Sequence, residues 1–235
     1  MKNPRVKLSL LFLLPALCLA CSRKAPENLI QLSGTLEMTE HGVGVPVAGR
    51  LIQVAVDEGD EVKQGQVLAL TDRFDLAERE YQRQELLLAR GGGSRQAVEQ
   101  AEMAMRDQRV ISPIDGVVLT KVHESGEVVS GNSPVFILGD RNRMWVRVFI
   151  PEGLVSRIEM NQEATLHFDG LAEEFKGRVT FIAPRAEFTP RNVQTPEERV
   201  TQTFAVKIAL ENPPQYLRPG VSAEVDLPMR PGAAP

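Results

Sequence analysis

Short bursts of alternating apolar and polar residues, broken by glycine and proline, fill most of the chain. Such alternation has the two-residue period of half-buried β-strands that are joined by tight turns. It runs through residues 29–70 and returns after Val110. In the C-terminal part it predicts strands at 145–150, 163–168, 177–182, 203–210 and 221–227. The pattern therefore predicts a mainly β protein.

One stretch between these strands has a helical period instead. Residues 72–90 contain no glycine or proline, and apolar side chains recur there at helical spacing, with Leu87 alongside them. The stripe consists of Phe74, Ala77, Tyr81 and Leu88. A first helix is expected here, and the run Gly91, Gly92 and Gly93 ends it.

A second helix is expected to begin directly after the glycines. Ser94 is a good N-cap, and the helix is predicted to continue to about Arg109. Its apolar stripe is Val98, Ala101 and Met105. Two helices joined by a tight glycine loop form an antiparallel hairpin whose stripes face each other, with arms of about 22 to 27 Å at 1.5 Å per residue.

The strand pattern on the two sides of this hairpin repeats. Pro46 and Pro113 each begin the motif Pro-x-x-Gly, and thirteen positions after each proline come Gly59-Asp60-Glu61-Val62 and Gly126-Glu127-Val128-Val129. Such a repeat indicates two quasi-equivalent halves packed together. The later strands suit a small closed β-barrel, because closure removes exposed edges, and residues 29–36 are a candidate sixth strand.

The N-terminus has the features of an export signal. Lys2, Arg5 and Lys7 precede an apolar run that is too short to span a bilayer. The run ends in Leu-Ala-Cys21, which resembles a lipobox and predicts lipidation of Cys21, although Cys18 stands where that motif usually has leucine. The alternative is an ordinary cleaved signal with incidental cysteines. Lipidation would hold the protein on a membrane surface.

Composition narrows the function classes. The chain is 43% hydrophobic but only 5% aromatic, which fits short strands and turns better than a large helical core. Its net charge is −4, and the basic N-terminal segment contributes no acid, so the remainder is more acidic still. Nucleic-acid binding depends on clustered basic residues, and this balance argues against it.

The order of these pieces resembles a known family, the periplasmic adaptor or membrane fusion proteins (HlyD family), in their lipoprotein form. The repeat resembles the halves of a split biotinyl/lipoyl-like domain, interrupted by a helical hairpin and followed by a β-barrel. The fragments that carry the resemblance are residues 47–51 (VAGRL), 58–68 (EGDEVKQGQVL), 112–118 (SPIDGVV) and 144–148 (MWVRV). Residues 186–195 are similar to a segment of adaptors that serve ABC-type exporters.

The resemblance implies a division of the chain. We expect a signal peptide at 1–20, a lipid-anchored tether with the first barrel strand at 21–40, and the first lipoyl-like half at 41–72. The short hairpin then spans 73–109, the second half 110–140, and the barrel 141–230, before a tail at 231–235. The expected fold is mainly β with an α-helical hairpin.

A three-residue pattern spans the predicted hairpin tip. Arg83, Leu87 and Ser94 follow the spacing Arg-x3-Leu-x6-Ser. This resembles the motif with which adaptors of tripartite pumps bind TolC-like channels. An exposed arginine and a hydroxyl group can hydrogen-bond to a partner while leucine packs between helices. The alternative assigns these residues to the hairpin itself: Ser94 as a cap, Leu87 as core and Arg83 as a solvated side chain.

The family role implies a non-catalytic adaptor in the periplasm, anchored to the inner membrane. Its implied partners are an inner-membrane transporter (an ABC permease favoured, RND type possible), a TolC-like outer-membrane channel, and further copies of the chain in a ring, taken as a hexamer. The chain departs from the pattern in two ways. Its hairpin is short, and the sequence ends soon after the barrel without the membrane-proximal domain that many adaptors have.

No cofactor or catalytic centre is expected. A lipoyl or biotinyl carrier needs a lysine at the turn between its halves, and none occurs between Lys63 and Lys121. His41, His123 and His167 are far apart and have no metal-ligand spacing, although the first two flank related strands. The alternative function is a metal- or solute-binding envelope protein that delivers cargo to an efflux pump of RND type.

Overall fold

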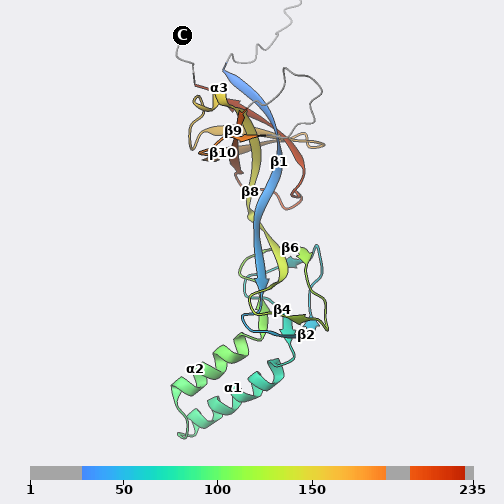
Figure 1. The fold of residues 1–235 in the computed structure, drawn as a ribbon, viewed down its shortest axis with the longest axis vertical. Coiled ribbons are helices and arrows are strands. Elements are labelled where there is room, and N and C mark those ends of the chain that lie inside the picture. The colour runs from blue at the N-terminus through green and yellow to red at the C-terminus, as the bar shows by residue number, and fades with distance from the viewer. Residues whose placement is uncertain (1–27, 189–201, 231–235) are drawn as a thin grey trace, which may run out of the picture.

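The protein is elongated, and three parts follow one another along its long axis (Figure 1). The computed structural model describes residues 28–188 and 202–230. A β-barrel lies at one end, a smaller β domain in the middle, and a helical hairpin at the other end. Within the described ranges, no helix has the length and hydropathy that crossing a membrane requires.

The barrel is closed by six antiparallel strands. In spatial order they run β8-β12-β10-β9-β13-β1, and β1 pairs with β8 again. This arrangement confirms the predicted closed barrel and its sixth strand. The strands are β1 (Leu29–Gly44), β8 (Pro134–Pro151), β9 (Glu163–Phe168), β10 (Glu174–Ile182), β12 (Gln202–Leu210) and β13 (Ser222–Pro228), accompanied by the short β11 (Glu187–Phe188) and α3 (Glu152–Val155).

Alternate residues of these strands point into the barrel and form its core. Leu36, Val148, Leu166, Ile208 and Val225 have no exposed surface. Buried and exposed residues therefore alternate along these strands with the same two-residue period as the apolar and polar residues of the sequence, as expected for a sheet closed around apolar side chains.

Two long strands connect the barrel to the middle domain. The strand that the sequence predicted at 145–150 is longer than expected: β8 runs without a break from Pro134 to Pro151, because β1 pairs with it along much of its length. The register shifts where Met38 faces Met144 but Thr39 faces Asp140, which leaves a bulge in β8. The Asn142 N–H donates to Asp140 Oδ1 at 2.9 Å within this bulge.

The middle domain is a sandwich of two sheets. One has the order β5-β4-β2-β7, and the other is the lower part of β1 and β8 extended by β6 and β3. Leu51, Leu68, Val110, Phe136 and Leu138 form the centre of its core. The additional strands are β2 (Gly49–Val54), β3 (Glu61–Val62), β4 (Val67–Thr71), β5 (Arg109–Ile111), β6 (Gly116–Lys121) and β7 (Val128–Val129).

The two sequence repeats interlock in this sandwich. Strands of the first half pair with strands of the second: β2 with β7, β3 with β6 and β4 with β5. The Gly59 N–H donates to the Val118 carbonyl at 2.8 Å, and the equivalent Gly126 N–H donates to Leu51 at 2.7 Å. Both glycines have φ values of 90° or more, so the repeated glycine serves a left-handed turn. The quasi-equivalent halves predicted from the repeat are confirmed.

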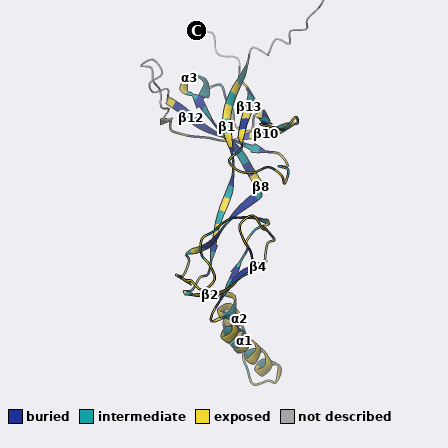
Figure 2. Cartoon of the chain, turned by 90° about the vertical axis from the view of Figure 1, so that its right-hand side faces the viewer, coloured by how far each residue is buried: buried dark blue, intermediate teal, exposed yellow. Residues whose placement is uncertain are grey.

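The hairpin consists of α1 (Phe74–Ala89) and α2 (Arg95–Arg106). Its second helix ends before the predicted Arg109, because that residue already belongs to β5. Figure 2 shows that the helices carry almost no buried surface, and Ala101 is their one buried residue. At the base of the hairpin, the Thr71 hydroxyl donates a buried hydrogen bond of 2.6 Å to Gln108 Oε1.

Candidate functional site

The tip of the hairpin is a glycine loop that closes the end of α1. The Gly91 N–H donates to the Leu88 carbonyl at 3.0 Å, and the Gly92 N–H donates to Leu87 at 2.9 Å. Gly91 has a φ of 76°. A Cβ atom on Gly93 would lie 2.8 Å from the Leu88 nitrogen, whereas one on Gly92 would meet nothing nearer than 3.9 Å. The tight turn therefore requires glycine at 91 and 93.

Ser94 caps the second helix, as the sequence predicted. Its backbone is extended (φ −119°, ψ 149°), and its Oγ accepts a hydrogen bond from the Ala97 N–H at 3.2 Å. In this role Ser94 is only an acceptor, so its hydroxyl proton remains available to an acceptor on a partner. The structural role and a docking role are therefore compatible at this residue.

Leu87 and Arg83 lie one turn apart near the end of α1. Leu87 is 41% exposed, while the adjacent Leu88 is half-buried, so the alternative that placed Leu87 in the hairpin core was wrong. The Arg83 side chain is 66% exposed and pairs with Glu80 one turn earlier. An exposed ion pair within one helix contributes little to stability, so the fold does not depend on Arg83.

The three tip residues thus come from the end of α1 and the first position before α2. Their side chains are an exposed cation, an exposed aliphatic group and a hydroxyl at the start of a helix. Such a set can hydrogen-bond to backbone or carboxylate oxygens and cover a small apolar area on a partner. The channel-docking role of this set stays a prediction.

The predicted lipid anchor falls outside the described residues. Cys21 and the signal segment precede residue 28, and most of the ABC-adaptor-like segment falls within 189–201. The first described residues belong to the barrel end that is remote from the hairpin (Figure 1).

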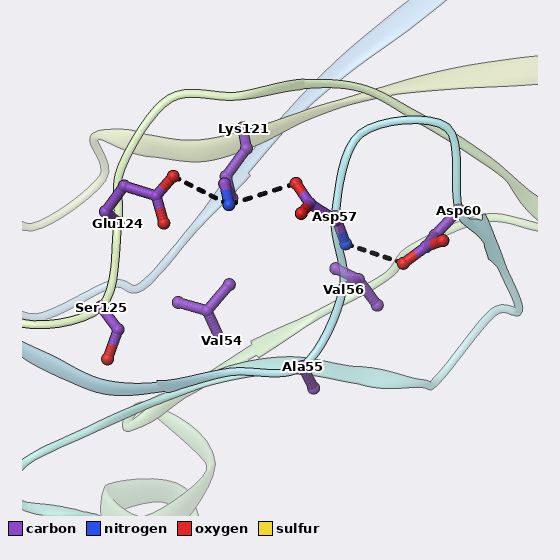
Figure 3. A pocket seen from close by; sticks show the side chains of 8 residues that line it. All are labelled: Val54, Ala55, Val56, Asp57, Asp60, Lys121, Glu124 and Ser125. Atoms are coloured by element: carbon purple, nitrogen blue, oxygen red, sulfur yellow. Dashed lines mark hydrogen bonds and ion pairs between the residues drawn. The ribbon is translucent and has the colours of Figure 1, made fainter.

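An open pocket lies in the middle domain between loops of the two halves (Figure 3). Lys121 lies between two carboxylates, with Nζ 3.1 Å from Asp57 and 2.8 Å from Glu124. Hydrogen bonds to these carboxylates raise the pKa of Lys121. The pKa of Asp57 is lowered, first by the Glu58 backbone N–H and then by Lys121. Because its only cation is already paired twice, the pocket is better suited to fixing two loops than to binding an anion.

The histidines do not form a shared site in the part of the chain that the structure describes. His123 pairs with Glu127 at 2.7 Å, which lowers the pKa of Glu127, and His167 pairs with Asp226 at 3.3 Å. His41 lies in β1 opposite Leu138. Among residues 28–188 and 202–230, no group of three or more His, Cys, Asp or Glu side chains has an arrangement that could hold a metal ion.

Sequence reasoning missed one surface. Leu76 and Leu86 of α1 are 71% and 51% exposed, on a helix whose predicted stripe faces α2. The sequence could have indicated their exposure, because neither leucine fits the spacing of the stripe that faces α2.

Comparison with known families identifies both β parts of the chain. A family model described as a CzcB-like barrel-sandwich hybrid domain matches residues 39–140. A second, described as a CusB-like beta-barrel domain, matches residues 143–230. Together the two matches cover most of the chain, and their boundary lies in the bulge of β8.

Relatives and solved structures agree with these matches. A UPF0194 membrane protein of Acidithiobacillus ferridurans is 26% identical over 87% of this chain and 88% of its own length. One from Citrobacter koseri is 24% identical over 83% and 87%. The first alignment has 299 positions, more than the 235 residues of this chain, so that relative has inserted residues.

Among solved structures, a MacA–MexA chimaera containing the Pseudomonas aeruginosa MexA α-hairpin domain gives a TM-score of 0.63 at 23% identity, covering 87% of this chain and 82% of that one. ZneB from Cupriavidus metallidurans gives 0.56 at 19% identity, covering 86% and 99%. The periplasmic adaptor protein EmrA gives 0.53 at 15% identity, covering 86% and 99%. These likenesses support the same fold.

Proposed function

This chain belongs to the periplasmic adaptor, or membrane fusion, protein family, and from that premise we propose that it is the adaptor subunit of a tripartite export system. In this role it links an inner-membrane transporter, favoured to be of ABC type, to a TolC-like outer-membrane channel. It works by binding both partners and transmitting conformational change, and it makes or breaks no covalent bonds.

The observation that carries the proposal is the separation of two binding ends on one elongated chain. The barrel end holds the first described residues, and the exposed hairpin tip lies at the opposite end (Figure 1). Residue 28 is seven positions after Cys21, so an extended tether reaches at most about 25 Å at 3.6 Å per residue. A lipid anchor at Cys21 would therefore keep the barrel close to the membrane and the transporter, with the tip directed away.

The proposed channel contact is confined to the tip. At 1.5 Å per residue the 16 residues of α1 extend about 24 Å from the middle domain. Arg83, Leu87 and Ser94 occupy the outer part of this length. Arg83 and Ser94 supply hydrogen-bonding groups and Leu87 an exposed aliphatic group, a combination typical of a non-obligate interface.

Several copies are proposed to act together in a ring, with a hexamer as the working stoichiometry. A single hairpin tip offers a small contact area, well below the roughly 1,200 Å² of a stable interface. A ring would multiply that contact, and multivalent attachment raises overall affinity without new contacts at each site.

The test uses a charge reversal at the tip with a matched control. We expect Arg83→Asp to abolish recovery of the outer-membrane channel after light crosslinking in cells, because the docking cation becomes an anion. Gln82→Asp places the same aspartate at the neighbouring exposed position, with a charge change of one unit rather than two, and should leave recovery unchanged. If both variants are expressed at the normal level and recover equal amounts of the channel, Arg83 does not take part in channel docking.

A further inference from the structure

Both helices of the hairpin leave the middle domain from one pair of strands. Strand β4 leads into α1, α2 leads into β5, and the two strands pair with each other where Leu70 faces Arg109. The hairpin projects away from the middle domain at this point (Figure 1). Its direction therefore depends on the residues at its base.

A buried polar pair connects the two sides of the base. The Thr71 hydroxyl donates to Gln108 Oε1 at 2.6 Å, and the Thr71 N–H donates to the Gln108 carbonyl at 3.0 Å. Thr71 has no exposed surface, and Gln108 is 8% exposed. Thr71 is the last residue of β4, and Gln108 follows the end of α2. The pair thus joins the strand that leads into α1 to the end of α2.

The Gln108 amide also closes the end of α2. Its Nε2 donates to the Ala104 carbonyl at 3.4 Å, which is one of the last four carbonyls of the helix. Because Nε2 is directed at this carbonyl, Oε1 is the amide atom that accepts from Thr71. One side chain therefore links α2 to β4, and a tilt of α2 would strain one of its two hydrogen bonds.

Thr71 is itself held by the neighbouring strand β2. A Cβ atom on Gly49 would lie 3.1 Å from Thr71 Cβ, so the lack of a side chain at Gly49 lets Thr71 pack closely against β2. The next residue, Asp72, exchanges two hydrogen bonds with Arg50: its N–H donates to the Arg50 carbonyl at 2.8 Å, and its Oδ1 accepts from the Arg50 N–H at 3.3 Å. The donor of the polar pair is therefore fixed relative to the sandwich.

A charged side chain makes a second contact at the base. The Arg109 guanidinium lies 4.7 Å from the centroid of the Phe74 ring, and its Nη2 donates to Met105 Sδ at 3.4 Å. Phe74 is the first residue of α1, and Met105 lies in the last turn of α2. Arg109 of β5 therefore contacts both helices next to the middle domain, and its cation–π contact adds to the restraint.

A small change of direction at the base is a large displacement at the tip. Helix α1 extends about 24 Å, so a tilt of about 10° would move the tip by about 4 Å. Hydrogen bonds to a partner tolerate only about half an ångström of variation in length. A hairpin without a fixed direction would present its docking groups correctly for only part of the time.

We propose that Thr71 and Gln108 are positioning residues, whose buried hydrogen bond fixes the direction of the hairpin relative to the middle domain and so presents the tip to the channel. A hydrogen bond suits this role better than an apolar contact, because it weakens steeply when its angle changes and a buried group without its partner is costly. The inference rests on the proposed adaptor function for the channel, whereas the restraint on the hairpin is a property of this chain alone.

The test compares variants that lose the bond with a variant that retains it. Thr71→Val and Gln108→Leu each leave one buried polar group without its partner, which also lowers stability. In the double variant both partners are apolar and similar in size to the originals, so stability should be close to the wild-type value although the directional bond is lost. Thr71→Ser retains the donor. Thr203→Val removes a buried barrel hydroxyl that donates to the Glu187 carbonyl at 3.3 Å, and it controls for the loss of a buried hydrogen bond elsewhere.

Two properties are measured in each variant. The direction of the hairpin is followed as the distance distribution between spin labels on non-canonical residues at the exposed positions of Lys63 and Glu85, which leaves Cys21 unchanged. Docking is followed as recovery of the channel from lightly crosslinked cells. We expect the double variant to show a broadened distribution and several-fold lower channel recovery at normal protein level. Thr71→Ser and Thr203→Val should match the wild type in both measurements.

An unchanged distance distribution in the double variant, or a broadened distribution with normal channel recovery, would overturn the positioning role. Equal effects in Thr71→Ser or Thr203→Val would also overturn it, because altered volume or general destabilisation would then explain the result. If the wild type itself recovers no channel, the proposed adaptor function fails, whereas the distance distributions still test whether the pair fixes the hairpin.

Discussion

Substitutions at Ser94 can separate its structural role as the cap of α2 from its proposed role in binding the channel, because both roles use the side-chain hydroxyl group. Its Oγ accepts the Ala97 N–H at 3.2 Å, which is the capping bond of α2. Replacing an N-cap serine by alanine costs about 1 kcal/mol, whereas aspartate retains an acceptor at this position. Aspartate cannot donate a hydrogen bond when ionised, so Ser94→Asp preserves the cap and removes the hydroxyl proton.

The two variants should therefore differ in hairpin stability and agree in channel binding. Ala101 is the only buried residue of the two hairpin helices, so the hairpin is expected to open locally without unfolding the β domains. Loss of about 1 kcal/mol of capping energy should raise the population of this open form roughly fivefold. We expect amide exchange in α2 to accelerate by about that factor in Ser94→Ala and to stay near the wild-type rate in Ser94→Asp. Loss of one hydrogen bond of about 0.5–1.5 kcal/mol should weaken channel binding several-fold in both.

The assays are hydrogen–deuterium exchange on the purified protein and quantitative recovery of the channel from crosslinked cells. Ser94→Thr serves as the control, because it retains both acceptor and donor. Wild-type channel recovery in Ser94→Asp would refute the docking role and leave Ser94 as a helix cap alone.

Further predictions concern the tip loop, the barrel, the middle domain and bound ligands. Gly93→Ala should accelerate amide exchange at the end of α1, because its Cβ would lie 2.8 Å from the Leu88 nitrogen, whereas Gly92→Ala should leave it unchanged. Leu166→Ala, at a fully buried barrel position, should lower the free energy of unfolding by about 2–5 kcal/mol in denaturant titrations followed by circular dichroism. The Lys121–Asp57 pair should stabilise the middle domain at neutral pH. The pKa of Asp57 is lowered first by the Glu58 N–H and then by Lys121, so the stability that Lys121 contributes is present above the ordinary aspartate pKa of about 4 and is lost as the pH falls through the lower folded-state value. The difference in unfolding free energy between the wild type and Lys121→Met should therefore shrink below about pH 4, and a constant difference down to pH 2 would contradict the pairing. Titration calorimetry with divalent metals should show no saturable binding tighter than about 10 μM, and tight binding would instead favour the cargo-delivery alternative.

The sequence predicted the structure best where apolar and polar residues alternate regularly and where a motif repeats. Alternation within 163–168 and 203–210 matched β9 and β12 closely, because each residue of a closed barrel faces either core or solvent. The repeat predicted the interlocked halves, because equivalent glycines such as Gly59 and Gly126 occupy equivalent left-handed turns. Ser94 was predicted as a cap from its residue type and its position after the glycines.

Long-range pairing was the part that the sequence did not predict. The continuity of β8 depends on β1, which is about one hundred residues earlier in the chain, so no local pattern near residues 140–143 indicates it. Helical spacing predicted Leu88 in the stripe, and Leu88 is half-buried, but the exposure of the adjacent Leu87 depends on how α1 turns toward α2. The pairing of Lys121 with Asp57 likewise joins two loops that are distant in sequence.

The measurement that tests the central claim most directly is mass spectrometry of the proteins that co-purify with this chain from cells lightly crosslinked in vivo. The adaptor account predicts recovery of both a TolC-like channel and an inner-membrane transporter, with an ATP-binding-cassette permease identifying the energy source. Recovery of neither partner from cells that express the protein well would contradict the account.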